Sequence, residues 1–108
     1  MDEVRVVYLG GPKDGIEVER ARGTGPYAEL VPRSVGPNGV VPAGYYIPQR
    51  LADSDGRRVL LWREGAQRPE IGVPSSVDAE QLRLINDTRR LFGRDEVHRL
   101  GPDEEAGW

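Results

Sequence analysis

RRVLLWR, residues 57–63, is the stretch that decides the fold. Its branched and aromatic residues alternate in the period of two that is typical of a β-strand. The polar stretch ADSDG (52–56) precedes it, and an earlier apolar run, YYIPQRL (45–51), comes before that. Two apolar runs on either side of a short polar turn predict a β-hairpin.

The amino-terminal part predicts a second hairpin. Val4, Val6 and Tyr8 alternate on one side of a glycine-rich turn, and Ile16 and Val18 alternate on the other. Glycine permits a positive φ and proline presets φ, so the turn has a physical basis. A ligand-binding loop is the alternative, although a phosphate loop needs Gly-Lys-Ser/Thr opening a helix. The predicted turn residues are Gly10, Gly11, Pro12, Asp14 and Gly15.

Between the two hairpins the sequence is interrupted by proline. We expect a short strand at 27–31 within an irregular loop that continues to about residue 42. Proline cannot donate to the hydrogen-bond ladder, which predicts short edge strands here and excludes a long central one. The prolines in question are those at positions 26, 32, 37, 42 and 48.

A single helix follows the predicted strands. GAQRPEIGVPSS (65–76) reads as a linker, and the next seventeen residues, 77–93, as a helix capped by Ser76 or Asp78 and ended by Gly93. Residues 94–108 form a mostly polar carboxyl-terminal arm. The apolar helix residues Leu82, Ile85 and Phe92 are predicted to pack on the sheet, and Leu84 and Leu91 to reach a second surface.

The fold class is therefore mainly β (α+β). We predict a small antiparallel sheet or partly open barrel of four to five strands, one carboxyl-terminal helix and an extended tail. A length of 108 residues fits one domain, with the sheet core in residues 1–64.

Charge and composition narrow the classes of function. The chain has 15 basic and 18 acidic residues, a net charge of −3 that does not favour binding to a nucleic acid. It lacks cysteine, which excludes disulfides and thiolate metal sites. No apolar run is long enough for a membrane span, and the first residues, MDEVRVV, carry acids where a signal peptide needs bases. We expect neither membrane association nor a cofactor.

Candidate reactive residues are few. The single histidine, His98, together with Ser75, Ser76 and Asp78, supplies the ingredients of a catalytic triad, but no nucleophile motif surrounds either serine. Helix capping explains these residues better. DSDG (53–56) resembles the start of a calcium loop, yet a hairpin turn is the stronger interpretation. We therefore predict no catalytic residue, no metal site and no enzyme activity.

The carboxyl-terminal tail has a large aromatic residue as its last. Trp108 follows the polar sequence GPDEEAG, and tryptophan is a preferred anchor in a partner's pocket. Either the tail folds back on its own sheet or a neighbouring subunit holds it. The apolar residues predicted to bind a partner are Trp108, Leu100, Val97, Leu84 and Leu91.

The amino-terminal motif supports a family resemblance. VVYLGGPKDGIEVE (6–19), a later Tyr-Tyr strand and a strand ending in Trp62 after the DSDGRR turn resemble small uncharacterised proteins of actinobacteria and their tailed phages. Those proteins share a Tyr-x-Gly-Gly-Pro-x-Asp-Gly start, a Tyr-rich strand and a final aromatic strand. The likeness covers roughly residues 4–63 and implies a compact β fold and a phage or prophage origin.

These features together predict a non-enzymatic interaction protein. We expect a minor structural component of an actinobacterial tailed phage, of the head-decoration or connector type, located in the virion and bound to capsid or other virion subunits. Edge strands, proline-rich loops and a terminal arm are features by which such subunits grip their neighbours. The alternative is an intracellular regulator or inhibitor that binds a host protein in the cytoplasm.

Overall fold

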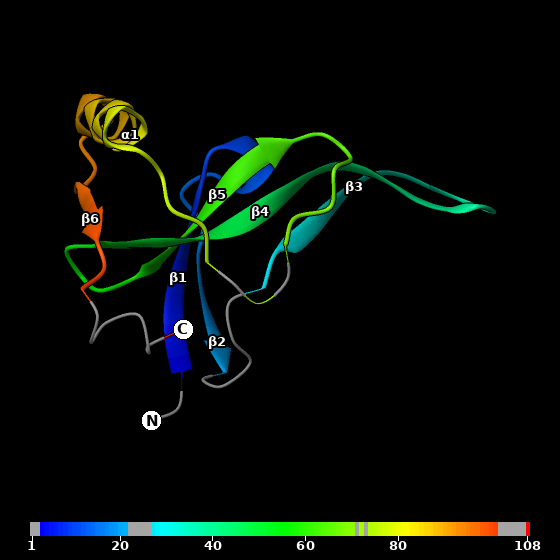
Figure 1. Cartoon of the computed structure of the whole chain (residues 1–108), viewed down its shortest axis with the longest axis horizontal. Coiled ribbons are helices and arrows are strands. Elements are labelled where there is room, and N and C mark those ends of the chain that lie inside the picture. The colour runs from blue at the N-terminus through cyan, green and yellow to red at the C-terminus, as the bar shows by residue number, and fades with distance from the viewer. Residues whose placement is uncertain (1–2, 22–26, 71, 73, 102–107) are drawn as a thin grey trace.

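A curled, half-barrel sheet of six strands forms the body of the protein, with one helix packed against it (Figure 1). The structure is a computed structural model and describes residues 3–21, 27–70, 72, 74–101 and 108. The strand order is β2-β1-β5-β4-β3, and β6 pairs with β4. This arrangement confirms the predicted fold class. The elements are β1 (Glu3–Leu9), the 3-10 helix η1 (Gly11–Lys13), β2 (Glu17–Ala21), β3 (Glu29–Gly36), β4 (Gly39–Asp53), β5 (Arg58–Glu64), α1 (Ala79–Leu91) and β6 (Val97–Arg99).

Both predicted hairpins are present. β1 and β2 pair antiparallel around η1, and β4 and β5 pair antiparallel around residues 54–57. In the second turn, the Asp53 carboxylate accepts hydrogen bonds from the amides of Asp55 (3.0 Å) and Arg57 (2.9 Å). The side chain of Asp53 therefore holds the hairpin turn, as an Asx turn does.

One strand pair differs from the predicted antiparallel arrangement. β1 and β5 are parallel neighbours, with Val6 opposite Arg58 and Leu9 opposite Leu61. Parallel pairs lie inside a sheet and are covered on both faces, so their sequences are continuous apolar runs. VVYL in β1 and VLL in β5 are such continuous apolar runs. The alternation of residues predicts a strand, but it does not indicate that the neighbouring strand is parallel.

The sheet buries side chains on both faces. Successive residues of a strand point to opposite faces, so β1 contributes Val6 and Tyr8 to one core cluster and Val7 and Leu9 to the other. The first cluster consists of Val4, Val6, Tyr8, Tyr46, Ala52, Leu60, Leu100 and Trp108. The second lies against α1 and consists of Val7, Leu9, Leu51, Val59, Val77 and Val97, with Leu61, Leu82 and Ile85 packed on it.

The prediction that proline excludes a long strand is wrong for β4. This strand has 15 residues and contains Pro42 and Pro48. Each proline lies where the ladder is irregular. Pro42 faces Pro32 at a register shift between β3 and β4, and the β4–β5 register shifts between Pro48 and Ala52. A bulge removes the need for the donor that proline lacks, so the strand continues through it.

Helix α1 begins and ends by local signals. Asp78 accepts a hydrogen bond from the Gln81 amide (2.8 Å), and the Gln81 side chain accepts one from the Asp78 amide (3.0 Å), which together form a capping box. Gly93, with a φ of 69°, follows the last turn in the left-handed conformation that glycine adopts most readily. Within the described residues, no helix has the length and apolar character needed to cross a bilayer.

The segments around the helix are attached to the sheet. Ser75, in the predicted linker, forms an isolated bridge with Gln49 of β4. After the helix, the side-chain amide of Asn86 donates to the Val97 carbonyl (3.0 Å) and its oxygen accepts from the Val97 amide (2.8 Å). These two bonds join β6 to α1.

Candidate functional site

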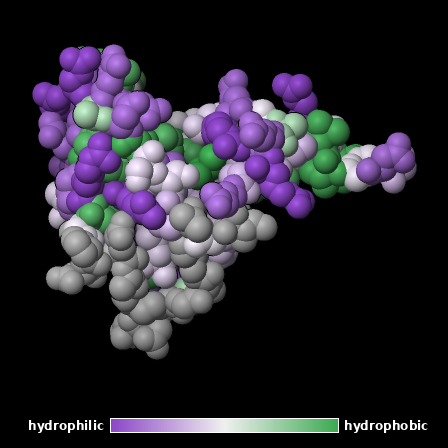
Figure 2. All heavy atoms as spheres, in the orientation of Figure 1, coloured by the Kyte–Doolittle hydropathy of each residue, from purple (hydrophilic) through white to green (hydrophobic). Residues whose placement is uncertain are grey.

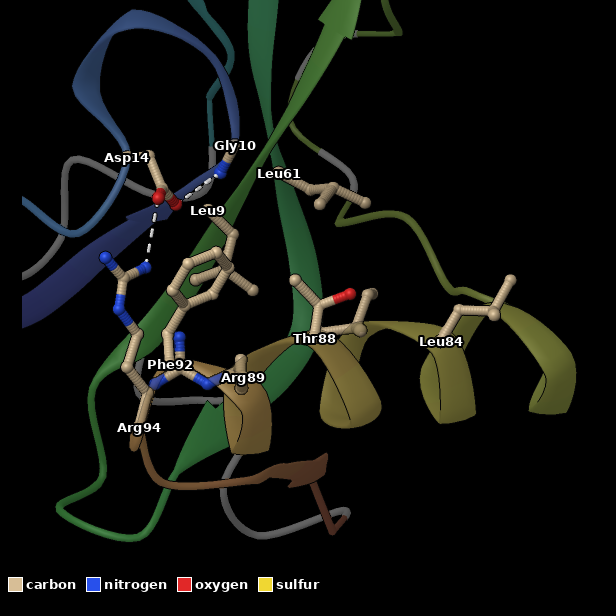
Figure 3. A pocket seen from close by; sticks show the side chains of 10 residues that line it. Leu9, Gly10, Asp14, Leu61, Leu84, Thr88, Arg89, Phe92 and Arg94 are labelled. Carbon is tan, nitrogen blue, oxygen red and sulfur yellow. Dashed lines mark hydrogen bonds and ion pairs between the residues drawn. The ribbon is translucent and has the colours of Figure 1, made fainter.

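A cleft between α1 and the sheet is the clearest concave site of the described molecule (Figure 3). Its volume is about 320 Å³, at the lower end of the range for small-molecule sites. Leu9 of β1 and Leu61 of β5 supply the sheet side, and the helix faces them. The helix and the residues that follow it contribute Leu84, Ile85, Thr88, Arg89, Phe92 and Arg94.

The cleft exists because α1 makes its close contacts with the sheet at only part of its length. Leu82 and Ile85 pack on the second core cluster. The next residue on that face is Arg89, and Phe92, which the sequence predicts to pack on the sheet, is 71% exposed. That prediction is wrong because a guanidinium occupies the place of an apolar anchor, and Phe92 consequently stands at the rim of the cleft.

The amino-terminal turn forms the polar end of the cleft. The Asp14 carboxylate accepts a hydrogen bond from the Gly10 amide (2.8 Å) and an ion-paired one from Arg94 (3.0 Å). Figure 3 draws both interactions beside the Phe92 ring, over which the Arg94 guanidinium lies at 5.7 Å. Burial raises the pKa of Asp14, but the Gly10 amide and Arg94 outweigh it, and the net pKa is below its ordinary value. The YLGGPKDG motif thus positions Arg94.

Arg89 is the most unusual residue of the cleft. It is only 8% exposed, although an arginine in an exposed helix turn normally reaches water. Its Nε donates to the backbone carbonyl of Asp95. Burial lowers the pKa of the Arg89 guanidinium, and nearby Arg94 lowers it further, while the Asp53 charge opposes the shift. The charges of Asp95 and Asp14 also oppose the shift.

A second, charged pocket of about 260 Å³ adjoins the cleft at Arg89 and Arg94. Its ionised groups are mostly paired with one another. Arg57 forms ion pairs with Asp53 (3.1 Å) and Glu17 (3.3 Å), which tie the β4–β5 turn to β2. This pocket is lined by Val7, Gly15, Glu17, Asp53, Arg57, Arg89, Gly93, Arg94 and Asp95.

A polar network around Glu29 lies on another part of the turn. The Glu29 carboxylate accepts hydrogen bonds from Tyr8 (2.7 Å) and from Lys13 (2.5 Å), and Arg20 lies 3.5 Å away. Burial raises the pKa of Glu29, but the bonds from Lys13 and Tyr8 outweigh it, so the pKa is lowered overall. The bond to Glu29 likewise raises the pKa of Lys13. This network connects β1, the turn and β3.

The tip of the β3–β4 hairpin extends away from the body as an arm, which we define as residues 32–42 (Figure 1). β5 pairs with β4 from Gly44 onward, so the arm is a two-stranded ribbon. Val35 faces Val40 across the ribbon and is 73% exposed. Figure 2 shows hydrophobic side chains behind the polar tip of the arm.

The structure distributes the predicted partner-binding residues between core and surface. Trp108, Leu100 and Val97 are buried in this chain's own core, where the Trp108 indole donates to the Gln49 carbonyl (3.3 Å). These three residues thus pack on the sheet of their own chain, which corrects the expectation that they anchor a partner. Leu84 and Leu91 are exposed on α1, and of the two only Leu84 lines the cleft.

The predicted turn residues all lie in the turn between β1 and β2. Gly10, Gly11 and Gly15 have positive φ, and Pro12 lies within η1. The Tyr46 hydroxyl donates to the Gly10 carbonyl and accepts from the Lys13 amide, both at 2.7 Å. The turn is therefore closed by contacts within the protein.

The residues considered for a triad have separate structural positions. Asp78 caps α1, the Ser76 hydroxyl accepts from Arg50 (3.4 Å), and Ser75 bridges to β4 through its backbone. His98 is exposed on β6 opposite Ala52. In the described part of the chain, no group of three or more His, Cys, Asp or Glu residues is placed to hold a metal ion.

Sequence reasoning missed both the cleft and the arm. The break in the apolar helix face at Arg89 was the available signal for the cleft, and the valines flanking Pro37 and Asn38 were the signal for the arm. Comparison of the chain with protein-family models, with curated proteins and with solved structures finds no match.

Proposed function

We propose that the protein is a non-enzymatic assembly subunit that holds a partner protein with the β3–β4 arm. The observation that carries this proposal is the exposure of the Val35–Val40 pair on a ribbon that leaves the body. The molecule measures 43 × 33 × 22 Å, and the arm lies at one end of its longest dimension.

The arm is poorly stabilised by the chain itself. A two-stranded ribbon is marginally stable in water, and every residue from 32 to 41 is exposed. Val35 and Val40 share one face of the ribbon, whereas Val41, opposite Ser34, lies on the other. Both faces therefore present apolar surface. A partner that covers the ribbon gains this burial and orders the arm at the same time.

The free edge of β3 offers a second means of attachment. Among the described residues β3 is the last strand on this side of the sheet, so the backbone groups on its outer side can pair with an added strand. Pro32 removes one donor from this edge. An added strand would thus pair best with the arm beyond Pro32, next to the exposed valines.

We propose more specifically that the partner is a capsid or other virion subunit, and that the protein is a minor virion component of an actinobacterial tailed phage, of the head-decoration or connector type. This assignment follows the family that we expect from the Tyr-x-Gly-Gly-Pro-x-Asp-Gly motif of residues 8–15, and the phage origin is part of the proposal. The arm supports it independently, because a projecting apolar ribbon is suited to contact with a fixed neighbour.

The absence of cysteine from the sequence makes a direct test possible. Val35→Cys, attached to a photo-cross-linker, is introduced into the phage that encodes the chain, and purified particles are analysed by mass spectrometry. We expect the chain in the particles, cross-linked from position 35 to another virion protein. Glu80→Cys is the matched control, because Glu80 is exposed on α1 and lies outside the arm.

Two results would overturn the proposal. Absence of the chain from purified particles removes the virion assignment, and a host protein cross-linked in infected cells then favours the regulator. Equal cross-linking from positions 35 and 80 removes the arm as the contact surface.

A further inference from the structure

The cleft beneath α1 has the chemistry of a ligand site that assembly through the arm does not use. Its walls are apolar side chains from two strands and a helix, and its polar atoms lie at the Arg89 end (Figure 3). Thr88 adds a hydroxyl on the helix side. Apolar walls with a few convergent polar groups are typical of pockets for small molecules.

Arg89 has donors that the chain itself leaves open. Its Nε bonds to the Asp95 carbonyl, but within residues 3–21, 27–70, 72, 74–101 and 108 no acceptor takes a hydrogen bond from either Nη. The residue is more than nine-tenths buried. Neither Nη is among the buried side-chain atoms that lack a partner, so both keep contact with solvent and an anion can reach them. The low-dielectric surroundings of a largely buried guanidinium strengthen its pairing with such an anion.

The neighbouring carboxylates do not take the place of such an anion, because each has other partners. Asp14 is held by the Gly10 amide and Arg94. Asp53 is held by Arg57 and two backbone amides. The Asp95 carboxylate accepts from the Ser54 hydroxyl (2.8 Å). Arg89 is thus a cation that lines the cleft and for whose Nη donors the described residues supply no hydrogen-bond acceptor.

Charge and size narrow the class of ligand. Glu17, Asp53 and Asp95 line the adjoining pocket, and their negative field disfavours a dianion such as a phosphate monoester. A single guanidinium matches one carboxylate in the bidentate geometry that arginine prefers. The whole cleft has a volume of about 320 Å³, and the part away from Arg89 is lined by leucine, isoleucine and phenylalanine side chains.

We propose that this cleft binds a small monocarboxylic acid with an apolar tail, its carboxylate on the Arg89 Nη donors and its tail between α1 and the Leu9–Leu61 side of the sheet. Arg94, held in place by Asp14 of the amino-terminal turn, closes the carboxylate end. Leu84 and Phe92 form the rim over the tail.

The test uses octanoate as the probe with the full chain, followed by titration calorimetry and by NMR shifts of the backbone amides. We expect saturable binding below about 1 mM, with shifts concentrated at Leu9, Gly10, Leu61 and the second half of α1. Shortening the tail should weaken binding by up to roughly three- to fourfold per methylene. Octanol, which has the same tail without the charge, should bind at least about tenfold more weakly.

Matched variants separate the cleft from the rest of the helix. Arg89→Gln should weaken octanoate binding at least about tenfold, whereas Arg90→Gln, exposed on the same helix, should leave it unchanged. Leu84→Glu places a carboxylate at the rim and should weaken binding to a similar extent, and Leu91→Glu, exposed outside the cleft, should not. Because Leu84 is exposed, its variant keeps the test decisive even if Arg89→Gln fails to fold.

Three results would overturn the proposal. The first is that binding does not saturate at 10 mM octanoate, about tenfold above the expected dissociation constant. The second is that octanol binds as tightly as octanoate, and the third is that the Leu84→Glu variant binds octanoate as tightly as the unchanged chain. None of these readouts involves the arm. If octanoate does not bind, the proposal for the arm is therefore unaffected and still depends on the cross-linking result at position 35.

Discussion

The indole of Trp108 donates a hydrogen bond to the backbone carbonyl of Gln49, so the last residue of the chain lies in the same core cluster as the first strand. The indole is buried and satisfies its one donor on β4. Trp108 is therefore a part of the fold. Its removal is expected to affect stability before it affects any contact with a partner.

Trp108→Ala should lower the free energy of unfolding by about 2–4 kcal/mol, because it removes a large buried ring and leaves a cavity. Urea denaturation followed by circular dichroism measures this change. Phe92→Ala removes an exposed aromatic ring and should change stability by no more than about 0.5 kcal/mol. Equal stability of the Trp108 variant and the unchanged chain would show that the tail does not contribute to the core.

Gly11→Ala should destabilise the amino-terminal turn for two reasons. Gly11 has a φ of 67°, and an added Cβ would lie 2.5 Å from the ring of Trp62 and 2.9 Å from the Tyr46 hydroxyl. We expect a loss of at least about 2 kcal/mol, from strain and overpacking together. The melting temperature and the urea midpoint both report it.

Gly36→Ala is the control for this prediction, because nothing lies within 4 Å of the Cβ that it would add. It should be neutral to within about 0.5 kcal/mol. If both alanine variants melted alike, the close packing of the turn on Trp62 would be refuted.

Asn86→Ala should detach β6 from the helix. The substitution leaves the amide and the carbonyl of Val97 without the two bonds that Asn86 provides, at a cost of about 1–3 kcal/mol. Hydrogen exchange measures the effect locally, and the Val97 amide should exchange faster. Arg83→Ala, an exposed position in the same helix, should leave that amide protected. Unchanged exchange in the Asn86 variant would contradict the proposed clamp.

Stability should fall at acidic pH in a way that depends on Glu29. Its pKa in the folded protein is below the ordinary value of 4.5, so the folded state binds the proton less readily than the unfolded state. The stabilisation is fully present above that ordinary pKa and is lost as the pH falls through the lower, folded-state pKa. Urea midpoints measured between pH 7 and pH 2 should show this loss.

Glu29→Gln removes the titrating group and should flatten the acid part of that curve relative to the unchanged chain. It should also be less stable at pH 7, because Lys13 and Tyr8 lose their charged acceptor. Glu80→Gln, at an exposed site, should keep the original pH dependence. Parallel curves for the Glu29 variant and the unchanged chain would exclude the proposed role of this network.

Local patterns were sufficient for the hairpins and the helix ends. The alternation in β1 and in RRVLLWR, the glycine-rich turn, Asp78 and Gly93 act within a few residues of one another, so their effect is readable along the chain. The long β4 was misjudged because the bulges that accommodate Pro42 and Pro48 arise from strand pairing. Pairing partners lie far apart in sequence.

What the sequence determined by itself is a part of the elements, namely two of the hairpins and one capped helix, together with the lack of thiol chemistry. The tertiary structure alone decided that β1 and β5 run parallel, that Trp108 closes its own core, and that Arg89 lies buried beside an apolar cleft. The reason is physical. Hairpins and helix caps depend on bonds between residues that are close in sequence. Burial depends on which distant segments pack together, and a local pattern does not indicate this.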